Sequence, residues 1–264
     1  MAGSGTQSLL QLIPHLVVPD GPVFIEQPTY NEHRPAWESA GHHTLSGVDF
    51  TIAQHKCKFY VFVAPNNPTG DDDRVKIEHA AQRCGSAGGF VLIDGAFAGG
   101  DTDADDVRLL EKLAQPHVLH LRSFGKFFGI AGLRLGFAIG PQEQISSLME
   151  RIGPWAVGTA ALDIGKLALG DEAWVKDHQN WLSQQTDHLS DLLARHELAV
   201  IGGTSLFRCV RCDHAAALQE HLGINGIWVR AFSAYPDLLR FGLPGNAAAF
   251  SSLDQALAKW HGKP

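Results

Sequence analysis

The feature that most restricts how this chain can fold is a series of short apolar runs separated by stretches with helical spacing. The runs are Pro22–Glu26, Phe59–Ala64, Phe90–Asp94, His117–Arg122 and Gly136–Gly140. A short run that is rich in Val, Ile, Leu and Phe is typical of a buried strand. Between two of these runs, Asp73 can cap a helix that ends at Gly85. Alternating strands and helices predict an α/β fold of three αβα layers, with a mostly parallel sheet between the helices.

The pattern changes in the second half of the chain. A long helical pattern extends from Asp171 to His196, and residues Phe250–Trp260 also have helical spacing. Short strands are predicted between them, at Ala199–Ile201, Leu206–Val210, Ile227–Arg230 and Leu238–Phe241. We therefore expect a large domain at residues 1–155, followed at residues 156–264 by a linking helix and a smaller α+β domain.

Charge and composition narrow the possible partners. The chain of 264 residues has 28 acidic and 21 basic side chains, and its net charge of -7 argues against a nucleic-acid partner. No apolar run is long enough to cross a membrane, and the first residues lack the basic and apolar regions of a secretory signal. The sequence therefore predicts a cytoplasmic protein, in which a few placed arginines can still bind a small anionic substrate.

Cys209 and Cys212 form a C-x-x-C pair with His214 close behind. One interpretation is a metal or redox pair. The other is a strand whose cysteines fill small spaces in the core. A zinc site needs four ligands, and the sequence has no second half of such a motif, so we favour the core interpretation and expect no metal.

Three polar elements follow or end predicted strands, where ligands bind in open α/β sheets. The first is Ala64-Pro65-Asn66-Asn67-Pro68-Thr69-Gly70, which could equally be a simple turn. The second is Asp94, which either caps the following helix or pairs with a buried cation. The third is Lys126, which lies in a stretch rich in glycine and phenylalanine. Burial there would lower the pKa of the amine and make it available for Schiff-base chemistry.

Together and in this order, the three elements resemble the fold-type-I family of enzymes that use pyridoxal 5′-phosphate (PLP). The resemblance implies that Lys126 carries the cofactor as a Schiff base and that Asp94 holds the pyridine nitrogen protonated, so that the ring withdraws electrons. It also implies that Asn67 hydrogen-bonds the phenolic oxygen of the cofactor. The aromatic ring of Tyr30, in Pro28-Thr29-Tyr30, would stack on the cofactor ring.

The same resemblance assigns the anion-binding residues. Ser123 and Arg134 would bind the cofactor phosphate together with the turn Ser4-Gly5-Thr6, because a helix N-terminus offers backbone N–H groups to an anion. Without the other motifs, this turn would be a simple helix cap. Arg240 resembles the arginine that binds the substrate carboxylate through two N–H groups. The alternative interpretation of Arg240 is a charged side chain on the surface of an edge strand.

The reaction is narrowed by shorter motifs. Phe97 stands where most aminotransferases have tyrosine, which removes a hydroxyl from the cofactor's phenolic oxygen. Gly5-Thr6-Gln7, Pro28-Thr29-Tyr30-Asn31-Glu32-His33, Arg122-Ser123-Phe124-Gly125-Lys126 and Leu239-Arg240-Phe241-Gly242-Leu243-Pro244 resemble L-threonine-O-3-phosphate decarboxylases of cobalamin biosynthesis, relatives of histidinol-phosphate aminotransferase. The resemblance implies a homodimer that acts on a small phosphorylated amino acid. Lys126, Asp94 and Tyr30 would be the catalytic residues, with Asn67 and Arg240 on the substrate.

Two alternatives stay open. One is an aminotransferase, in which Lys126 moves a proton from Cα instead of CO2 leaving. The other is a weakly active PLP-fold protein, because family members usually have several dozen residues before the turn that begins here at Ser4. His33 has two possible roles as well, namely contact with the substrate phosphate or packing on the large domain.

Overall fold

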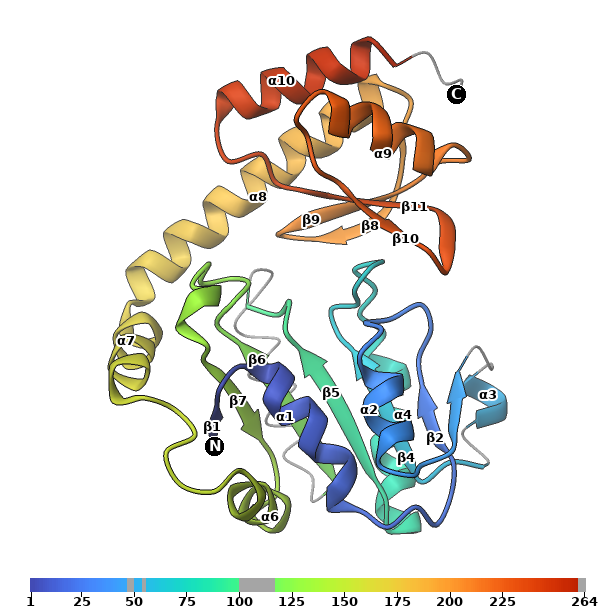
Figure 1. Cartoon of the computed structure of the whole chain (residues 1–264), viewed down its shortest axis with the longest axis vertical. Helices are drawn as coiled ribbons and strands as arrows, with labels where there is room; N and C mark the ends of the chain where they lie inside the picture. The colour runs from blue at the N-terminus through green and yellow to red at the C-terminus, as the bar shows by residue number, and fades with distance from the viewer. Residues whose placement is uncertain (47–49, 54–55, 100–116, 261–264) are drawn as a thin grey trace. The chain divides into compact units, whose positions relative to one another are not determined.

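The computed structural model describes residues 1–46, 50–53, 56–99 and 117–260 (Figure 1). The chain divides into two compact units. Met1–Asn67 and Asp71–Glu172 form the large unit, whereas Pro68–Gly70 and Ala173–Pro264 form the small unit. The sequence analysis put the boundary after residue 155. In the structure the chain passes into the small unit only at Ala173, because helix α7, Thr159–Gly170, belongs to the large unit.

Within the described residues, seven strands form the sheet of the large unit, in the order β1-β7-β6-β5-β4-β2-β3. Strands β3, β2, β4, β5 and β6 are parallel, and β7 and β1 add an antiparallel edge. The bounds are β1 Ala2–Gly3, β2 Val23–Ile25, β3 Thr44–Ser46, β4 Phe59–Val63, β5 Phe90–Gly95, β6 Val118–Ser123 and β7 Gly136–Ile139. The predicted mostly parallel sheet is confirmed.

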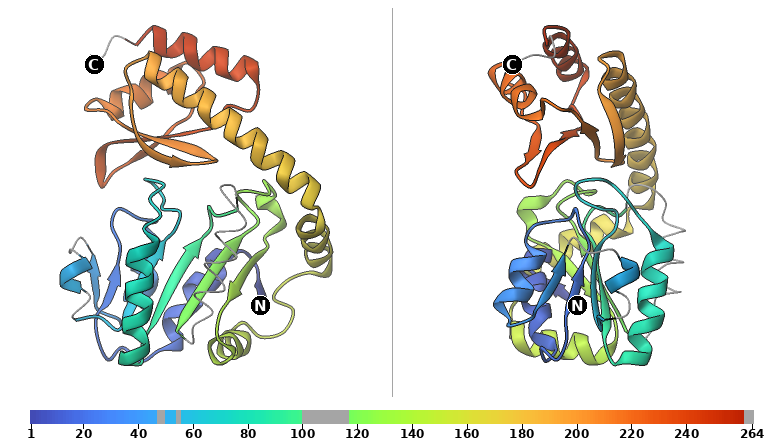
Figure 2. Two further views of the ribbon diagram at one scale, coloured as in Figure 1. Left: turned by 180° about the vertical axis from the view of Figure 1, so that it is seen from behind. Right: turned by 90° about the vertical axis from the view of Figure 1, so that its right-hand side faces the viewer.

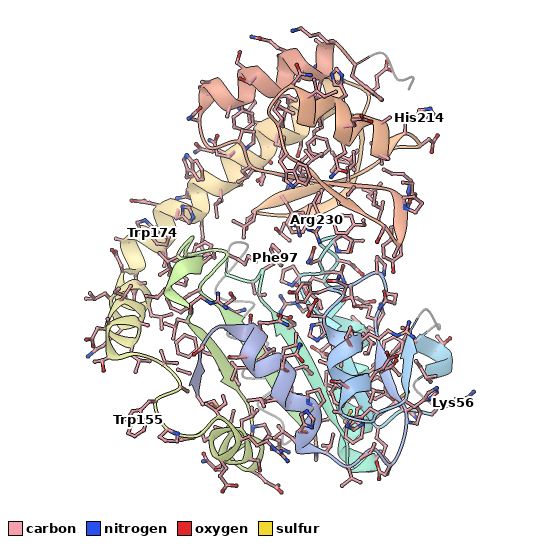
Figure 3. The ribbon with its side chains drawn as sticks, in the orientation of Figure 1. Lys56, Phe97, Trp155, Trp174, His214 and Arg230 are labelled. Atoms are coloured by element: carbon pink, nitrogen blue, oxygen red, sulfur yellow. The ribbon has the colours of Figure 1, made fainter. Side chains whose placement is uncertain are left out.

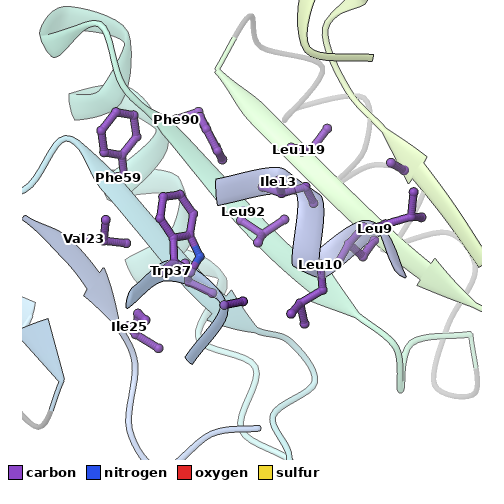
Figure 4. Close-up of a cluster of buried hydrophobic side chains, with 14 of the residues drawn as sticks. Leu9, Leu10, Ile13, Val23, Ile25, Trp37, Phe59, Phe90, Leu92 and Leu119 are labelled. Carbon is purple, nitrogen blue, oxygen red and sulfur yellow. The ribbon is translucent and has the colours of Figure 1, made fainter. Parts of the chain in front are cut away.

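Helices cover both faces of this sheet, which gives the three layers seen in Figures 1 and 2. The helices of the large unit in the described residues are α1 Thr6–Leu12, η1 Ile13–Leu16, α2 His33–Ser39, α3 Phe50–Ala53, α4 Arg74–Ala87, η2 Ala131–Leu133, α6 Gln142–Ile152 and α7 Thr159–Gly170. Alternate residues of β4 separate the two cores: Phe59 and Val61 pack with α1, α2 and α6, and Tyr60 and Phe62 pack with α4. Figure 4 shows the first core, in which Trp37 of α2 is buried against the sheet.

The small unit is α+β, as predicted. Four strands of its described residues form an antiparallel sheet in the order β10-β11-β9-β8. Its elements are α8 Glu172–Arg195, β8 Ala199–Thr204, β9 Phe207–Arg211, α9 Ala215–Ile224, β10 Arg230–Phe232, β11 Tyr235–Gly242 and α10 Ala247–Ala258. Apolar side chains of α8, α9 and α10 form one core with those of β9 and β11.

Two predicted boundaries are wrong for local reasons. Helix α4 continues past Gly85 to Ala87, because the residue that adopts the left-handed conformation of a C-cap is Gly88, with a φ of 67°. The strand expected at Ile227–Arg230 is instead Arg230–Phe232, which pairs with β11 across a tight connection. The N-terminal cap predicted for α4 is correct, since the carboxylate of Asp73 accepts a hydrogen bond from Lys76 N at 2.9 Å.

Candidate active site

The topology brings five predicted cofactor residues to one edge of the large sheet. Asp94 lies in β5, Ser123 ends β6, and Lys126 follows β6 after a short turn. Asn67 follows β4, and Tyr30 follows β2. These four strands are neighbours and run parallel, so their carboxyl ends meet at the same edge.

Asp94 is buried and is held by two donors. Its Oδ2 lies 2.9 Å from Nε2 of His33, and its Oδ1 accepts a hydrogen bond from Ala96 N at 3.0 Å. With Asp94 ionised, Nε2 of His33 is the donor of this hydrogen bond, because an ionised carboxylate only accepts. His33 is fully buried at the start of α2, and its Nδ1 has no hydrogen-bond partner within the described residues. This pairing was not predicted from the sequence. The only indication of it in the sequence is that His33, an ionisable residue, comes three positions after Tyr30.

Tyr30 is half-buried beside the same histidine. The rings of Tyr30 and His33 meet edge to face, with centroids 6.1 Å apart. The hydroxyl of Tyr30 donates to Oε1 of Gln7 in α1 at 3.2 Å. Gln7 in turn donates from Nε2 to Oε2 of Glu32 at 3.3 Å. Helix α1 therefore fixes the position of the tyrosine ring through its side-chain amide.

Lys126 extends from a cluster of aromatic rings. The residues on either side of its turn, Phe124 and Phe127, are buried, while the side chain of Lys126 itself is exposed. The prediction that this amine is buried is therefore wrong for the chain without a cofactor. The side chains of Phe124 and Phe127 point into the core, and that of Lys126 points away from it. Its Nζ lies over the ring of Phe97, 5.1 Å from the centroid. Phe97 is three residues after Asp94, so this contact connects the end of β5 to the lysine.

The turn before α1 and Arg134, the segments predicted to cradle the cofactor phosphate, lie against each other. Gly5 has a φ of 83°, and a Cβ at this position would lie 2.6 Å from Nη2 of Arg134. Only glycine leaves room for the guanidinium there. Arg134 itself has a φ of 54°, and its Nη2 donates to the carbonyl oxygen of Ser4 at 3.4 Å. The hydroxyl of Ser4 donates to the carbonyl of Ala156.

One close backbone approach and one hydrogen bond to a side chain bring the neighbouring segments of this predicted cradle together. A Cβ at Gly136 of β7 would lie 2.5 Å from Thr6 N, so glycine lets β7 pass directly beside the N-terminus of α1. Ser123 Oγ accepts a hydrogen bond from Gly125 N at 3.1 Å, which closes the turn that leads to the lysine. Thr6, Ser123 and Arg134 therefore belong to adjoining segments around the start of α1.

The Asn-Asn-Pro-Thr-Gly motif is divided between the two units. Asn66 bonds within the large unit, since its Nδ2 donates to Pro28 O at 2.9 Å, and Asn67 is the next residue. Pro68–Gly70 belongs to the small unit, where a Cβ at Gly70 would lie 2.1 Å from the carbonyl oxygen of Gly203 in β8. Two backbones touch at this point, which explains the glycines in both segments.

The small unit presents two arginines side by side. Arg240 in β11 is the direct cross-strand partner of Arg230 in β10, which Figure 3 labels. The guanidinium of Arg240 lies 5.2 Å from the centroid of the Phe207 ring. Burial lowers the pKa of Arg240, and the neighbouring charge of Arg230 lowers it further. Like charges at opposite positions of a strand pair are unfavourable unless an anion lies between them. Arg240 was predicted from the sequence as a substrate ligand, and its neighbour Arg230 was not singled out, because only strand register brings the two together.

The C-x-x-C pair shows the features of a core position. Cys209 is buried in β9, and burial raises the pKa of its thiol to about 11. Cys212 is half-buried. Among the residues that the structure describes, no three His, Cys, Asp or Glu side chains are grouped so that they could hold a metal ion. In the same part of the chain, no helix is both long enough and apolar enough to span a lipid bilayer.

These residues fit pyridoxal phosphate. The guanidinium of Arg134, which lies against Gly5, and the N-terminus of α1 suit its phosphate. The buried carboxylate of Asp94 suits a protonated pyridine nitrogen, and the amine of Lys126 can bond to its aldehyde. When bound, the cofactor supplies an electron-withdrawing ring that stabilises negative charge on the substrate's Cα.

Comparison with known proteins agrees with this fit. The family model for aminotransferase class I and II matches residues 1–253. Threonine-phosphate decarboxylase of Pseudomonas aeruginosa is 35% identical over 96% of this chain and 76% of its own, and that of a Sinorhizobium species is 38% identical over 97% and 76%. The structure of histidinol-phosphate aminotransferase from Sinorhizobium meliloti in complex with pyridoxal-5′-phosphate superposes with a TM-score of 0.81 at 21% identity, covering 97% of this chain and 75% of that one. The chain therefore belongs to the aminotransferase class I and II family, whose cofactor is pyridoxal phosphate.

Proposed function

We propose that this protein decarboxylates L-threonine O-3-phosphate to aminopropanol phosphate. The observation that carries the proposal is the identity of 35% and 38% to two threonine-phosphate decarboxylases over nearly the whole chain. The reaction removes the carboxylate as CO2 and places a proton on Cα. A place in cobalamin biosynthesis and a cytoplasmic location form part of the same proposal.

In this reaction Asp94 would hold the proton of the pyridine nitrogen, and His33 would fix the orientation of its carboxylate through the 2.9 Å contact between Nε2 and Oδ2. Lys126 would hold the cofactor covalently through its aldehyde, and the free amine of Lys126 would be available to move a proton at Cα. Tyr30 packs against the cofactor ring, and Ser4, Gly5, Thr6, Ser123 and Arg134 hold its phosphate.

The substrate has two anionic groups, and the small unit has two neighbouring guanidiniums. Arg240 binds the carboxylate through two N–H groups, as the resemblance implies. We assign the substrate phosphate to Arg230, the cross-strand partner of Arg240. Asn67 contributes a side-chain amide to the cofactor's phenolic oxygen and to the substrate. The arginine pair favours a doubly anionic substrate over unphosphorylated threonine, which lacks the second anion.

The purified protein, loaded with pyridoxal phosphate, tests this function. It is incubated with threonine phosphate in the presence and absence of a 2-oxo acid. Release of CO2 and aminopropanol phosphate without the 2-oxo acid supports a decarboxylase. Turnover that requires the 2-oxo acid identifies an aminotransferase instead. If the loaded protein shows no turnover with or without the 2-oxo acid, it is the weakly active PLP-fold protein of the second alternative.

The covalent role of Lys126 needs a separate control. Borohydride reduction followed by peptide mass spectrometry should place the cofactor on Lys126, and Lys126→Ala should lose the cofactor's absorbance band. Lys58→Ala is the matched control, because this lysine lies outside the site in an ion pair with Asp20 at 2.7 Å. A band that survives in Lys126→Ala would mean that another lysine carries the cofactor.

We also propose a homodimer. Helix α7 exposes four large apolar side chains, Leu162, Ile164, Leu167 and Leu169, and Trp155 precedes it with 94% of its surface exposed (Figure 3). Apolar residues gathered on one exposed helix are typical of a protein interface. Light scattering after gel filtration should give twice the chain mass. Leu167→Glu should reduce that mass to one chain, whereas Lys166→Glu on the same helix should not.

A further inference from the structure

We propose that the ring of Phe97 keeps the amine of Lys126 in its ammonium form, and that this favours decarboxylation over transamination. The inference rests on the proposed function and adds a residue that determines the outcome of the reaction. The observation behind it is the position of Lys126 Nζ over the ring of Phe97, 5.1 Å from the centroid. An ammonium within about 6 Å of an aromatic face is stabilised by the negative charge of that face.

The local structure holds the two groups in place. Phe97 is buried, and the backbone turn from Asp94 to Ala98 is fixed by hydrogen bonds from Ala96 N to Asp94 and from Ala98 N to Gly95 O. On the other side, Gly129 N bonds to the carbonyl oxygen of Lys126 at 3.0 Å. The ring and the amine therefore belong to two fixed turns at the ends of neighbouring strands, β5 and β6.

The protonation state of Lys126 distinguishes the two reactions. In decarboxylation, the bond between Cα and the carboxylate carbon breaks, CO2 leaves, and the bonding electron pair stays on the substrate. The ammonium of Lys126 then gives its proton to Cα, and solvent returns a proton to the amine. In transamination, a neutral amine must first remove the proton of Cα. A ring that stabilises the ammonium therefore favours decarboxylation and disfavours transamination.

The first readout is spectroscopic and needs no substrate. The absorbance of the holoenzyme changes with pH as the nitrogen that Lys126 shares with the cofactor loses its proton. Phe97→Leu keeps an apolar side chain without the aromatic face, and it should lower the midpoint of this change by about half a pH unit. Phe97→Trp keeps an aromatic face, so its midpoint should equal or exceed that of the wild type.

A matched control separates the ring from general packing. Phe137→Leu removes a ring from the same aromatic cluster, where Phe137 contacts Phe124 with centroids 5.5 Å apart. Its midpoint should match the wild type. Among the residues that the structure describes, the charged side chains on the neighbouring elements include Asp94 with its partner His33, Arg122 near the end of β6 and Arg134 after η2. They are unchanged in all three variants, so a difference between variants reports the ring at position 97.

The second readout is the partition of products from threonine phosphate. Phe97→Leu should form about two to five times more pyridoxamine phosphate per CO2 than the wild type, and Phe97→Trp should form no more than the wild type. A wild-type midpoint in Phe97→Leu, or an equal shift in Phe137→Leu, overturns the proposal. If the midpoint shifts as expected but no variant releases CO2, the ring acts on the amine as inferred, while the proposed function and the preference for decarboxylation are both wrong.

Discussion

The imidazole of His33 and the carboxylate of Asp94 form a buried hydrogen bond, with Nε2 2.9 Å from Oδ2. The two residues come from different layers, since His33 begins α2 and Asp94 lies in β5. Side chains from both the helical layer and the sheet therefore position the carboxylate that would face the cofactor's ring nitrogen in the proposed site.

Replacing His33 should impair the reaction more than the fold. In His33→Phe the buried carboxylate loses a charged hydrogen bond, and we expect kcat/KM for threonine phosphate to fall about ten- to a hundredfold, with weaker cofactor binding. Steady-state kinetics and a cofactor titration measure both effects. His42→Phe is the control, because His42 is also buried but bonds to Pro14 O at 2.9 Å. Equal losses in the two variants would mean that His33 has only a packing role.

Arg230→Gln should weaken recognition of the substrate's phosphate. The variant keeps Arg240 for the carboxylate, so we expect KM for threonine phosphate to rise about tenfold or more with a smaller change in kcat. Inorganic phosphate should inhibit the wild type more strongly than the variant. Arg211→Gln, which removes an exposed arginine paired with Asp237 at 3.0 Å, should leave KM unchanged. An unchanged KM in Arg230→Gln would assign the phosphate to other residues.

The ion pair of Glu26 and Lys76 predicts a pH-dependent stability. Their side chains are 16% and 25% exposed, and the two groups lie 2.8 Å apart. Burial raises the pKa of Glu26, and Lys76 offsets only part of this rise. Burial acts to lower the pKa of Lys76, but its pairing with Glu26 raises it overall. The raised pKa of Glu26 indicates that ionising it costs folding free energy, whereas the raised pKa of Lys76 indicates that the ion pair contributes stability. We give more weight to Glu26, because the more buried partner loses more hydration.

Lys76→Met should therefore destabilise the protein most at neutral pH. A carboxyl group with a raised pKa contributes its stability below its unfolded value and loses it as the pH rises through the folded value. We expect the free energy of unfolding to fall by about 2 kcal/mol at pH 7 and by much less near pH 5. Urea unfolding at several pH values measures this. The double variant with Glu26→Gln should recover most of the loss, and a loss that is independent of pH would contradict the argument.

The four cysteine thiols should react with a thiol reagent at different rates, because they differ in burial. Burial raises the pKa of Cys57 and Cys209 to about 11 and that of Cys84 to about 12, so few of these groups are thiolates at pH 8. Cys212 is the one cysteine that is not buried. A thiol reagent at pH 8 should therefore label Cys212 first, and all four only after unfolding. Rapid labelling of Cys209 in the native protein would contradict the core interpretation of the C-x-x-C pair.

The sequence by itself determined the layered α/β architecture, because strands buried on both faces must be apolar at every position and helices must not. It also singled out Lys126, Asp94 and the Gly5 turn as candidates, because residue types that are unusual at the ends of apolar strands stand there. A lysine among phenylalanines and a glycine before a helix are local features of the chain, and local features can be read without coordinates.

Only the tertiary structure decided which of these residues meet. The contact of His33 with Asp94 joins residues 61 positions apart, and the pairing of Arg230 with Arg240 depends on strand register. The contact of Lys126 with Phe97 depends on how two turns at the ends of neighbouring strands are folded. Such contacts follow from packing between elements, which a sequence pattern restricts but does not specify. The lysine's exposure has the same origin, because its apolar neighbours turn inward and leave the amine outside the core.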